Sequence, residues 1–221
     1  MHYLNNPQLL SSLMQQLIKG FGTSLSIFGW TLILSLPLGM IVALGRMSRH
    51  KWLSTPVSLY ILIMRGTPLM LQLFAVYFFL PRLLGIPIDR FTSTIVAFAL
   101  NYAAYFAEIY RGGILSIPKG QYEAGQVLGF TRGQTFGRIV LPQVIKRVLL
   151  PVSNEVITLV KDTSLATAIA VGELFLVAKN ATSSSGSVEP LFIAGLFYLL
   201  LNTVVTLLFS WLVKWFDYYR D

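Results

Sequence analysis

The sequence predicts an all-α polytopic membrane protein with five transmembrane helices, from its composition, its long apolar runs and the placement of its basic residues. Hydrophobic residues make up 55% of the 221 positions and charged residues only 12%, whereas a soluble domain carries about 25% charged residues. Only helices and closed barrels satisfy their backbone polar groups in lipid. The runs are too long and continuous for barrel strands, so we expect helices.

Five apolar runs define the expected spans, and together they form a single membrane domain over residues 1–221. They cover residues 20–44, 56–84, 92–115, 148–178 and 190–214. The opening residues have no basic region and no cleavage site typical of a signal peptide. We therefore expect the first span to act as an uncleaved insertion signal.

Basic residues predict the orientation of these spans. One set of loops holds Arg46, Arg49, Lys51, Arg111, Lys119, Arg132, Arg138, Lys146, Arg147, Lys214 and Arg220, and the other set holds Lys19, Arg82, Arg90 and Lys179. Cytoplasmic loops are enriched in Lys and Arg, so the N-terminus is expected outside and the C-terminus inside. The aromatic residues expected at the inner interface are Trp52, Trp211, Trp215, Tyr218 and Tyr219. The net charge of +8 then reflects topology, not nucleic-acid binding.

The second run is interrupted by the sequence Arg-Gly-Thr-Pro at residues 65–68. Pro68 removes a backbone donor from the carbonyl of Met64 and pushes Thr67 out of helical geometry. We predict a break there, with Thr67 as N-cap of a new half-helix that begins at Pro68. Thr67 would lie about 16 Å into the membrane. A half-helix N-terminus at that depth suits a substrate carboxylate.

The fourth run is too long for one straight span, since residues 146–178 would extend about 50 Å as a helix. The polar stretch at residues 161–164 predicts a second break, with Asp162 or Thr163 capping the half-helix that follows. Glu155 lies almost two turns earlier and can face the same interior. Ionisable residues within a span are costly and usually mark a transport pathway or an ion pair.

The segment at residues 116–147 is the only sizeable cytoplasmic connection expected. It contains a short helix-compatible stretch at residues 122–128, followed by Gly129 as a helix stop. Its sequence matches the pattern Glu-Ala-Ala, three residues, Gly, nine residues, Ile-x-Leu-Pro. The matching residues are Glu123, Ala124, Gly129, Ile139, Leu141 and Pro142, with Gly125 in place of the second alanine.

This pattern resembles permease subunits of ABC importers, whose loop forms a coupling helix that docks on the ATP-binding subunit. The resemblance implies that role for Tyr122, Glu123, Ala124, Gly125 and Gly129. The small residues Ala124 and Gly125 would allow close backbone approach to the partner. The alternative is an amphipathic helix lying on the inner leaflet.

The motifs RGTP and KDTSL, with NYAAYFAEIYRGGI at residues 101–114, resemble the polar amino acid branch of these permeases. The resemblance implies the type I ABC importer permease fold and a mid-membrane substrate pocket. The implied pocket residues are Gly66, Thr67, Pro68, Leu69, Glu155, Lys161, Asp162 and Thr163. Thr67 and Lys161 would take the α-carboxylate, and Glu155 and Asp162 the α-amino group or a cationic side chain.

Some assignments stay open at this point. Lys161 and Asp162 can instead neutralise each other, Arg65 and Glu108 are expected to form a structural ion pair, and Glu173 has no assigned role. The sequence does not specify which amino acid is carried, or whether a second permease is identical to this chain.

The resemblance implies a subunit of an ATP-driven importer of polar amino acids in the bacterial inner membrane. Its partners would be ATP-binding subunits, an extracytoplasmic solute-binding protein and a second permease. The chain lacks cysteine and a GxxxxGK[ST] phosphate loop, and His2 and His50 are expected to be simply solvated. We therefore expect no enzyme activity and no metal or cofactor site, with ATP and Mg²⁺ bound by the partner. The alternatives are a self-sufficient secondary transporter or channel, and a membrane anchor.

Overall fold

The computed structural model describes residue 3 and residues 6–216, and this part of the chain is helical without β-strands. Its α-helices are α1 (Pro7–Arg46), α2 (Lys51–Gly66), α3 (Leu69–Phe74), α4 (Leu80–Leu84), α5 (Arg90–Leu115), α6 (Lys119–Val127), α7 (Arg132–Thr135), α8 (Leu141–Asp162), α9 (Leu174–Ser185) and α10 (Glu189–Phe216). Two π-helical segments, η1 (Ala75–Phe79) and η2 (Phe136–Val140), and the 3₁₀ segment η3 (Thr163–Ile169) join them. The all-α prediction is confirmed, whereas the expectations for His2, Tyr218, Tyr219 and Arg220 lie outside the described residues.

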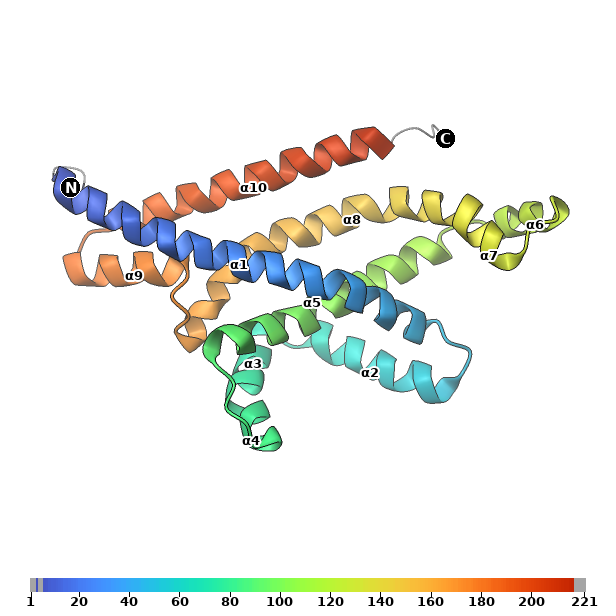
Figure 1. Cartoon of the computed structure of the whole chain (residues 1–221), viewed down its shortest axis with the longest axis horizontal. Coiled ribbons are helices and arrows are strands. Elements are labelled where there is room, and N and C mark those ends of the chain that lie inside the picture. The colour runs from blue at the N-terminus through green and yellow to red at the C-terminus, as the bar shows by residue number, and fades with distance from the viewer. Residues whose placement is uncertain (1–2, 4–5, 217–221) are drawn as a thin grey trace.

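The long helices α1, α5, α8 and α10 run along the length of the molecule (Figure 1). The short helices α6 and α7 lie at one end, and α9 lies near the other end, where α1 begins. Helices α3 and α4 project from the side of the bundle. Since α10 runs back toward the end that carries α6, the start of α1 and the end of α10 lie toward opposite ends.

Helix α1 begins thirteen residues before the apolar run that predicted it, so the expected start at residue 20 was wrong. The Asn6 side chain accepts hydrogen bonds from the amides of Gln8 and Leu9, and a proline occupies the first turn. Leu13 and Leu17 in this extension are buried against α9 and α10. Lys19 therefore lies within a helix and not in an outer loop.

Length and hydropathy qualify two of the helices as membrane spans on their own, namely α1 and α10. Two further pairs qualify only when each is taken as one broken span: residues 51–66 with 69–84, bent by 111°, and residues 132–169 with 174–185, bent by 57°. Helix α5 has 26 residues, about 39 Å at 1.5 Å per residue. Its hydropathy is lowered by buried polar residues such as Ser93, Thr94 and Asn101.

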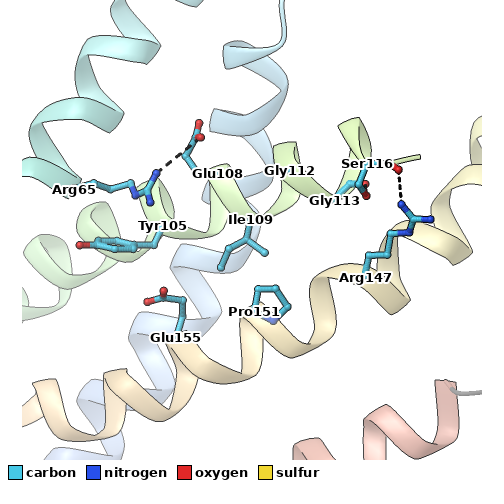
Figure 2. A pocket seen from close by; sticks show the side chains of 10 residues that line it. All are labelled: Arg65, Tyr105, Glu108, Ile109, Gly112, Gly113, Ser116, Arg147, Pro151 and Glu155. Carbon is cyan, nitrogen blue, oxygen red and sulfur yellow. Dashed lines mark hydrogen bonds and ion pairs between the residues drawn. The ribbon is translucent and has the colours of Figure 1, made fainter. Parts of the chain in front are cut away.

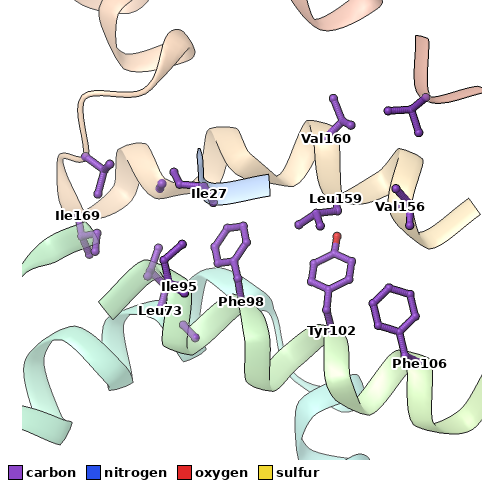
Figure 3. Close-up of a cluster of buried hydrophobic side chains, with 14 residues drawn as sticks. Ile27, Leu73, Ile95, Phe98, Tyr102, Phe106, Val156, Leu159, Val160 and Ile169 are labelled. Carbon is purple, nitrogen blue, oxygen red and sulfur yellow. The ribbon is translucent and has the colours of Figure 1, made fainter. Parts of the chain in front are cut away.

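Helix α5 forms the centre of the packing, with α1 along one face and α8 along another. Figure 3 shows Phe98, Tyr102 and Phe106 pointing from α5 toward α8, where Val156 and Leu159 meet them. Gly39 allows α1 to approach closely, because a Cβ there would lie 2.8 Å from the Cβ of Phe106. The core therefore holds α5 in place between the two helices.

The outer faces of several helices are apolar and uncovered. Within α10 the buried residues are Pro190, Ala194 and Val205, whereas Phe192 is 72% exposed and Leu200 65% exposed. A soluble protein does not leave such a long apolar helix face in water. The exposed faces fit hydrocarbon as the surrounding solvent.

Candidate functional site

The second apolar run is broken where the proline predicts it. Helix α2 ends at Gly66, Thr67 adopts extended geometry, and α3 begins at Leu69. The chain turns by 111° at this point. The break leaves helical hydrogen-bonding groups to be satisfied by other parts of the chain.

Two side-chain amides satisfy the carbonyl of Met64, the group that the sequence predicts to lose its partner. It accepts hydrogen bonds from Gln72 Nε2 at 2.9 Å and from Asn101 Nδ2 at 3.0 Å. Asn101 Nδ2 also donates to Gln72 Oε1 at 2.9 Å. The bend is therefore attached to the centre of α5.

Thr67 does not cap the half-helix that follows, so that prediction was wrong. Its hydroxyl donates backward to the carbonyl of Ile63 at 2.8 Å and accepts from Gln72 Nε2 at 2.8 Å. Pro68 itself has extended backbone angles, with φ −62° and ψ 134°, so α3 starts one residue later and has no side-chain cap. Thr67, Gly66 and Pro68 are all exposed at the bend.

The fourth run also breaks at the predicted place, since α8 ends at Asp162 and continues as the 3₁₀ segment η3. Asp162 and Thr163 do not cap α9, because η3 and four further residues separate them from it. The Thr163 hydroxyl instead donates to the carbonyl of Val160 at 2.8 Å. The segment η3 packs against α3, so the two breaks lie together.

Glu173 is the actual cap of α9, and the sequence did not single it out for this role. Its carboxylate accepts 2.7 Å hydrogen bonds from the amides of Phe175 and Leu176. The hydroxyl of Tyr198 in α10 donates to the Glu173 carboxylate at 3.0 Å. The Glu173 side chain is fully buried. The signal for this cap was the position of an acidic residue directly before an apolar helical stretch.

Asp162 pairs with a residue that sequence reasoning missed. It accepts a 2.8 Å hydrogen bond from the hydroxyl of Tyr102, which is buried in the centre of α5. Lys161 beside it is exposed. Asp162 is therefore fixed to the core, whereas Lys161 is accessible.

A cavity of about 610 Å³ lies between α5 and α8 on the α6 side of the two breaks (Figure 2). Its lining residues are Arg65, Tyr105, Glu108, Ile109, Gly112, Gly113, Ser116, Arg147, Pro151 and Glu155. Glu155 alone of the predicted substrate residues lines it. Residues 66–69 and 161–163 lie nearer the breaks and do not form its wall.

Within this cavity, Glu155 faces in from α8 and Arg65 from α2 (Figure 2). In the described part of the chain, Glu155 makes no hydrogen bond or ion pair, so its carboxylate remains available. The Arg65 guanidinium lies 5.3 Å from the centre of the Tyr105 ring, which favours a cation–π contact. The cavity thus offers the free carboxylate of Glu155 and the guanidinium of Arg65 to a ligand, whereas Arg147, which also lines it, donates to the carbonyl of Ser116.

Three arginines lie within 4.0 Å of the Glu108 carboxylate, beside the cavity. Arg65 Nη1 lies 3.9 Å from this carboxylate, which confirms the expected ion pair. The nearest partner is nevertheless Arg111, whose Nη2 and Nε donate at 2.7 and 3.0 Å. Arg46 Nε lies 4.0 Å away. Because Arg111 occupies both carboxylate oxygens, Arg65 is held only loosely.

The segment at residues 116–147 forms the short helix that the sequence predicts, as α6. The helix ends at a glycine in left-handed geometry, Gly129 with φ 74°. The amide of Phe130 donates to the carbonyl of Gly125 at 2.9 Å, a hydrogen bond typical of a glycine-terminated helix. The predicted stop at Gly129 is confirmed.

Gly125 is buried inside this segment and is not available for a partner to approach. A Cβ at this position would lie 2.5 Å from Thr135 Cγ2. Its small size therefore serves the packing of α6 against α7, which corrects the expectation for this residue. Glu123 and Ala124 are exposed, whereas Tyr122 is half-buried against the base of α8.

Two exposed apolar residues at the end of α6 were not singled out from the sequence. Val127 is 88% exposed and Leu128 67% exposed. Both directly precede the helix stop, in a segment already expected to bind a partner. Their apolar character was the signal that could have identified them.

Residues 35–218 match the family described as binding-protein-dependent transport system inner membrane component. This chain is a member of that family. Among its relatives, the octopine transport system permease protein OccM of Rhizobium radiobacter is 39% identical over 95% of this chain and 89% of the relative. The arginine transport system permease protein ArtQ of Bacillus subtilis is 39% identical over 86% of this chain and 87% of the relative.

A solved structure agrees with the assignment from sequence. The crystal structure of an amino acid ABC transporter with histidines contains a chain that superposes with a TM-score of 0.86 and 29% identity. The match covers 96% of this chain and 97% of that one. The chain therefore has the type I ABC importer permease fold, and the resemblance inferred from its motifs is confirmed.

Family membership decides the class of function. The chain is an ABC importer permease, a transport component embedded in a membrane, and ATP hydrolysis belongs to a separate subunit. ATPase subunits and a binding protein are its general partners. The alternatives of a self-sufficient transporter and of a membrane anchor for an enzyme are set aside.

Proposed function

We propose that this permease carries polar amino acids, and that the cavity between α5 and α8 holds the substrate during transport. The proposal rests on one observation: Glu155, which has no hydrogen-bond or ion-pair partner among the described residues, and Arg65, which is only weakly held by Glu108, line the same cavity. A zwitterion presents an ammonium and a carboxylate, which these two groups can bind by charge-assisted hydrogen bonds. The relatives' substrates, octopine and arginine, both carry an amino group and a carboxylate.

The roles divide by charge. Glu155 binds the α-amino group or a cationic side chain, and Arg65 binds the α-carboxylate. This assignment adds Arg65 to the residues expected from the motifs. Arg65 is 44% exposed and has weak internal partners, so a ligand can recruit it at low cost.

The residues at the two breaks lie outside the wall of this cavity, farther along the chain from Arg65 and Glu155. We propose that Gly66, Thr67, Pro68 and Leu69 approach the ligand from the bend of the second run, and that Lys161, Asp162 and Thr163 approach it from the end of α8. Lys161 is accessible for the carboxylate. Asp162 acts mainly by holding α8 against α5 through Tyr102. The Thr163 hydroxyl is already engaged by the carbonyl of Val160 in the preceding turn.

The membrane arrangement that fits this function has five spans. We assign them to α1, the α2–α4 pair, α5, the pair formed by α8 and α9, and α10. The outward N-terminus and cytoplasmic C-terminus follow from the basic residues, which are concentrated at the α6 end. All 221 residues then belong to one transmembrane domain in the bacterial inner membrane.

Helix α6 serves as the coupling helix in this proposal. Its exposed residues Glu123, Ala124, Val127 and Leu128 would enter a cleft of the ATP-binding subunit, which holds ATP and Mg²⁺. Tyr122, Gly125 and Gly129 shape the helix that presents them. This arrangement favours docking over a helix lying flat on the lipid, because the exposed apolar area is small and sits at the helix tip.

Transport requires a second permease, identical or homologous, because one chain of five spans is too small to enclose a pathway. A solute-binding protein delivers the amino acid at the end opposite α6. Closure of the ATP-binding subunits then moves the coupling helices and tilts the permeases between outward and inward openings. The broken helices hold the ligand while the openings exchange.

The test is the ATPase activity of the reconstituted permease, ATPase and binding protein with each of the twenty amino acids and cystine. Stimulation by one amino acid or a group of polar amino acids is expected. Selective stimulation by arginine, lysine or histidine would indicate that Glu155 reads the side chain. A response to none of them would contradict the substrate class.

A further inference from the structure

A second cavity, of about 440 Å³, lies on the α1 and α2 side of α5, and its Arg46 and Ser58 end has no role in the transport proposal. Its lining residues are Arg46, Ser58, Ile61, Leu62, Arg65, Gly66, Tyr105 and Glu108. Arg65, Tyr105 and Glu108 also line the first cavity and form the wall between the two. The Arg46 and Ser58 end belongs to this second cavity only.

The cavity has more positive than negative charge. Arg46, Arg65 and Arg111 surround the single carboxylate of Glu108, and Arg111 alone makes two close hydrogen bonds to it. The other two guanidiniums lie about an ångström farther away, at 4.0 and 3.9 Å. These distances leave their hydrogen-bond donors largely unused. Guanidinium groups with unused donors bind water or an anion through charge-assisted hydrogen bonds.

Arg46 is positioned for such an anion. It is the last residue of α1, at the end of the molecule that carries α6, and its side chain is 39% exposed. Its Nη1 donates to the hydroxyl of Ser58, which in turn donates to the carbonyl of Ser54 at 2.5 Å. This hydrogen-bond chain fixes the guanidinium at the cavity while leaving its remaining N–H groups free. A planar guanidinium suits the oxygens of a phosphate.

The helices beside the cavity expose apolar side chains. On α1, Ile41 is 66% exposed and Leu44 58% exposed; on α2, Leu59 is 56% and Leu62 69% exposed. Leu62 lines the cavity itself, so the basic group and the apolar surface are continuous. A ligand that fits both is an anionic headgroup attached to acyl chains, whereas a free anion would use only the basic part.

We propose that the cavity between α1 and α2 binds the phosphate of an anionic phospholipid from the leaflet on the α6 side. Arg46 binds the phosphate oxygens, and Ser58 holds Arg46 in place. Arg65, which the transport proposal assigns to the substrate carboxylate, adds positive charge from the wall shared by the two cavities. The acyl chains lie along the exposed leucines and isoleucine of α1 and α2. Because Arg65 also faces the first cavity, a bound lipid sets the position of a residue beside the transport site.

The experiment measures lipids retained by the purified transporter complex, using native mass spectrometry with phosphatidylglycerol and phosphatidylcholine of identical acyl chains. The intact protein is expected to retain phosphatidylglycerol preferentially. The substitution Arg46→Gln removes charge-assisted hydrogen bonds and is expected to reduce that retention by about tenfold. The control is Lys214→Gln, which removes an exposed basic residue from the last turn of α10. This substitution should leave the retention of phosphatidylglycerol unchanged.

Three results would overturn the proposal. They are equal retention of the two lipids, an equal loss in Lys214→Gln, and binding of inorganic phosphate that displaces phosphatidylglycerol at similar concentrations. The last result would identify a free-anion site. If Arg46→Gln does not assemble, a photoactivatable phosphatidylglycerol on the intact complex gives the answer. Its crosslinks should map to residues 41–46 and 58–65, and crosslinks confined to α10 would reject the site.

Discussion

Asn101 and Gln72 make the broken second span compatible with a membrane. A carbonyl without a partner in hydrocarbon costs several kcal/mol, roughly the cost of an unmade hydrogen bond in an apolar medium. The Met64 carbonyl avoids this cost by accepting two side-chain hydrogen bonds. Asn101 also orients Gln72, so one residue of α5 supports the whole bend.

The substitution Asn101→Leu should therefore destabilise the permease. Asn101 is 4% exposed, and its replacement leaves the oxygen of Gln72 without this donor. We expect a loss of about 1–3 kcal/mol in unfolding free energy. Thermal unfolding in detergent measures it, with Asn154→Leu at an exposed position of α8 as the matched control. Equal effects of the two substitutions would show that the amide network does not hold the bend.

Asp89 caps the N-terminal end of α5. Its side chain accepts hydrogen bonds from the amide and the hydroxyl of Thr92, at 3.0 and 2.5 Å. These hydrogen bonds lower the pKa of the Asp89 carboxyl, with the Thr92 hydroxyl as the largest cause. The cap is thus strongest when the carboxyl is ionised.

Asp89→Ala should cost about 1 kcal/mol of stability at neutral pH, the usual contribution of an N-cap. Because the folded-state pKa is lowered, the electrostatic part is present above the unfolded value, about 3.9, and is lost as pH falls through the folded value. The difference from the unsubstituted permease should therefore shrink below about pH 4. Thermal unfolding at a series of pH values measures this difference. A difference that grows with acidification would contradict the capping role.

At the scale of elements, the packing of α6 on α7 depends on a single glycine. A Cβ on Gly125 would lie within 2.5 Å of two Thr135 side-chain atoms. The related pattern carries alanine at this position, whereas here the glycine lies against Thr135.

Gly125→Ala should accordingly weaken the α6–α7 unit by about 1–3 kcal/mol through overpacking. Thr135→Ala in the same chain removes both clashing atoms and should recover most of that loss. Substrate-stimulated ATPase activity of the reconstituted complex, together with thermal unfolding, checks this double-mutant cycle. Gly133→Ala, at a position with open space around it, is the control. Additive losses in the double mutant would show that the contact with Thr135 is not the cause.

The elements that local chemistry determines were the predictable ones. Pro68 lacks a backbone donor and restricts Thr67, and Gly129 can adopt the left-handed geometry that ends a helix, so both features followed from the sequence. The cap at Glu173 was not singled out, because its burial and its hydrogen bond from Tyr198 of α10 are tertiary features of the folded chain. The early start of α1 likewise depends on tertiary contacts, since Leu13 and Leu17 are buried only against α9 and α10.

The sequence identified the acidic residue of the candidate site, Glu155, but did not identify its basic residue, Arg65. Glu155 stood out as an ionisable residue within an apolar run. Arg65 was expected to pair with Glu108, and that pair exists. What the sequence did not reveal is that Arg111, three residues from Glu108, occupies the carboxylate and leaves Arg65 available. Such competition between partners depends on side-chain geometry in the folded chain.

At the scale of the whole molecule, α5 separates two cavities of different chemistry. The cavity on the α8 side carries a free carboxylate and suits a zwitterion, whereas the one on the α1 and α2 side carries surplus guanidinium and suits a phosphate. Arg65 borders both. A permease built this way can connect the state of the surrounding lipid to the site that holds the substrate.

We propose that Glu155 binds the amino acid in transit, and ATP-driven uptake into proteoliposomes tests this role most directly. The complex contains permease, ATPase and saturating binding protein, and the amino acid is the one that stimulates ATPase. With Glu155→Gln, uptake should fall by about tenfold or more, because a charge-assisted hydrogen bond of about 1.5–3 kcal/mol is lost. Thr158→Val, at an exposed position of α8 three residues on, should keep normal uptake. Normal uptake by a properly assembled Glu155→Gln complex would contradict the account.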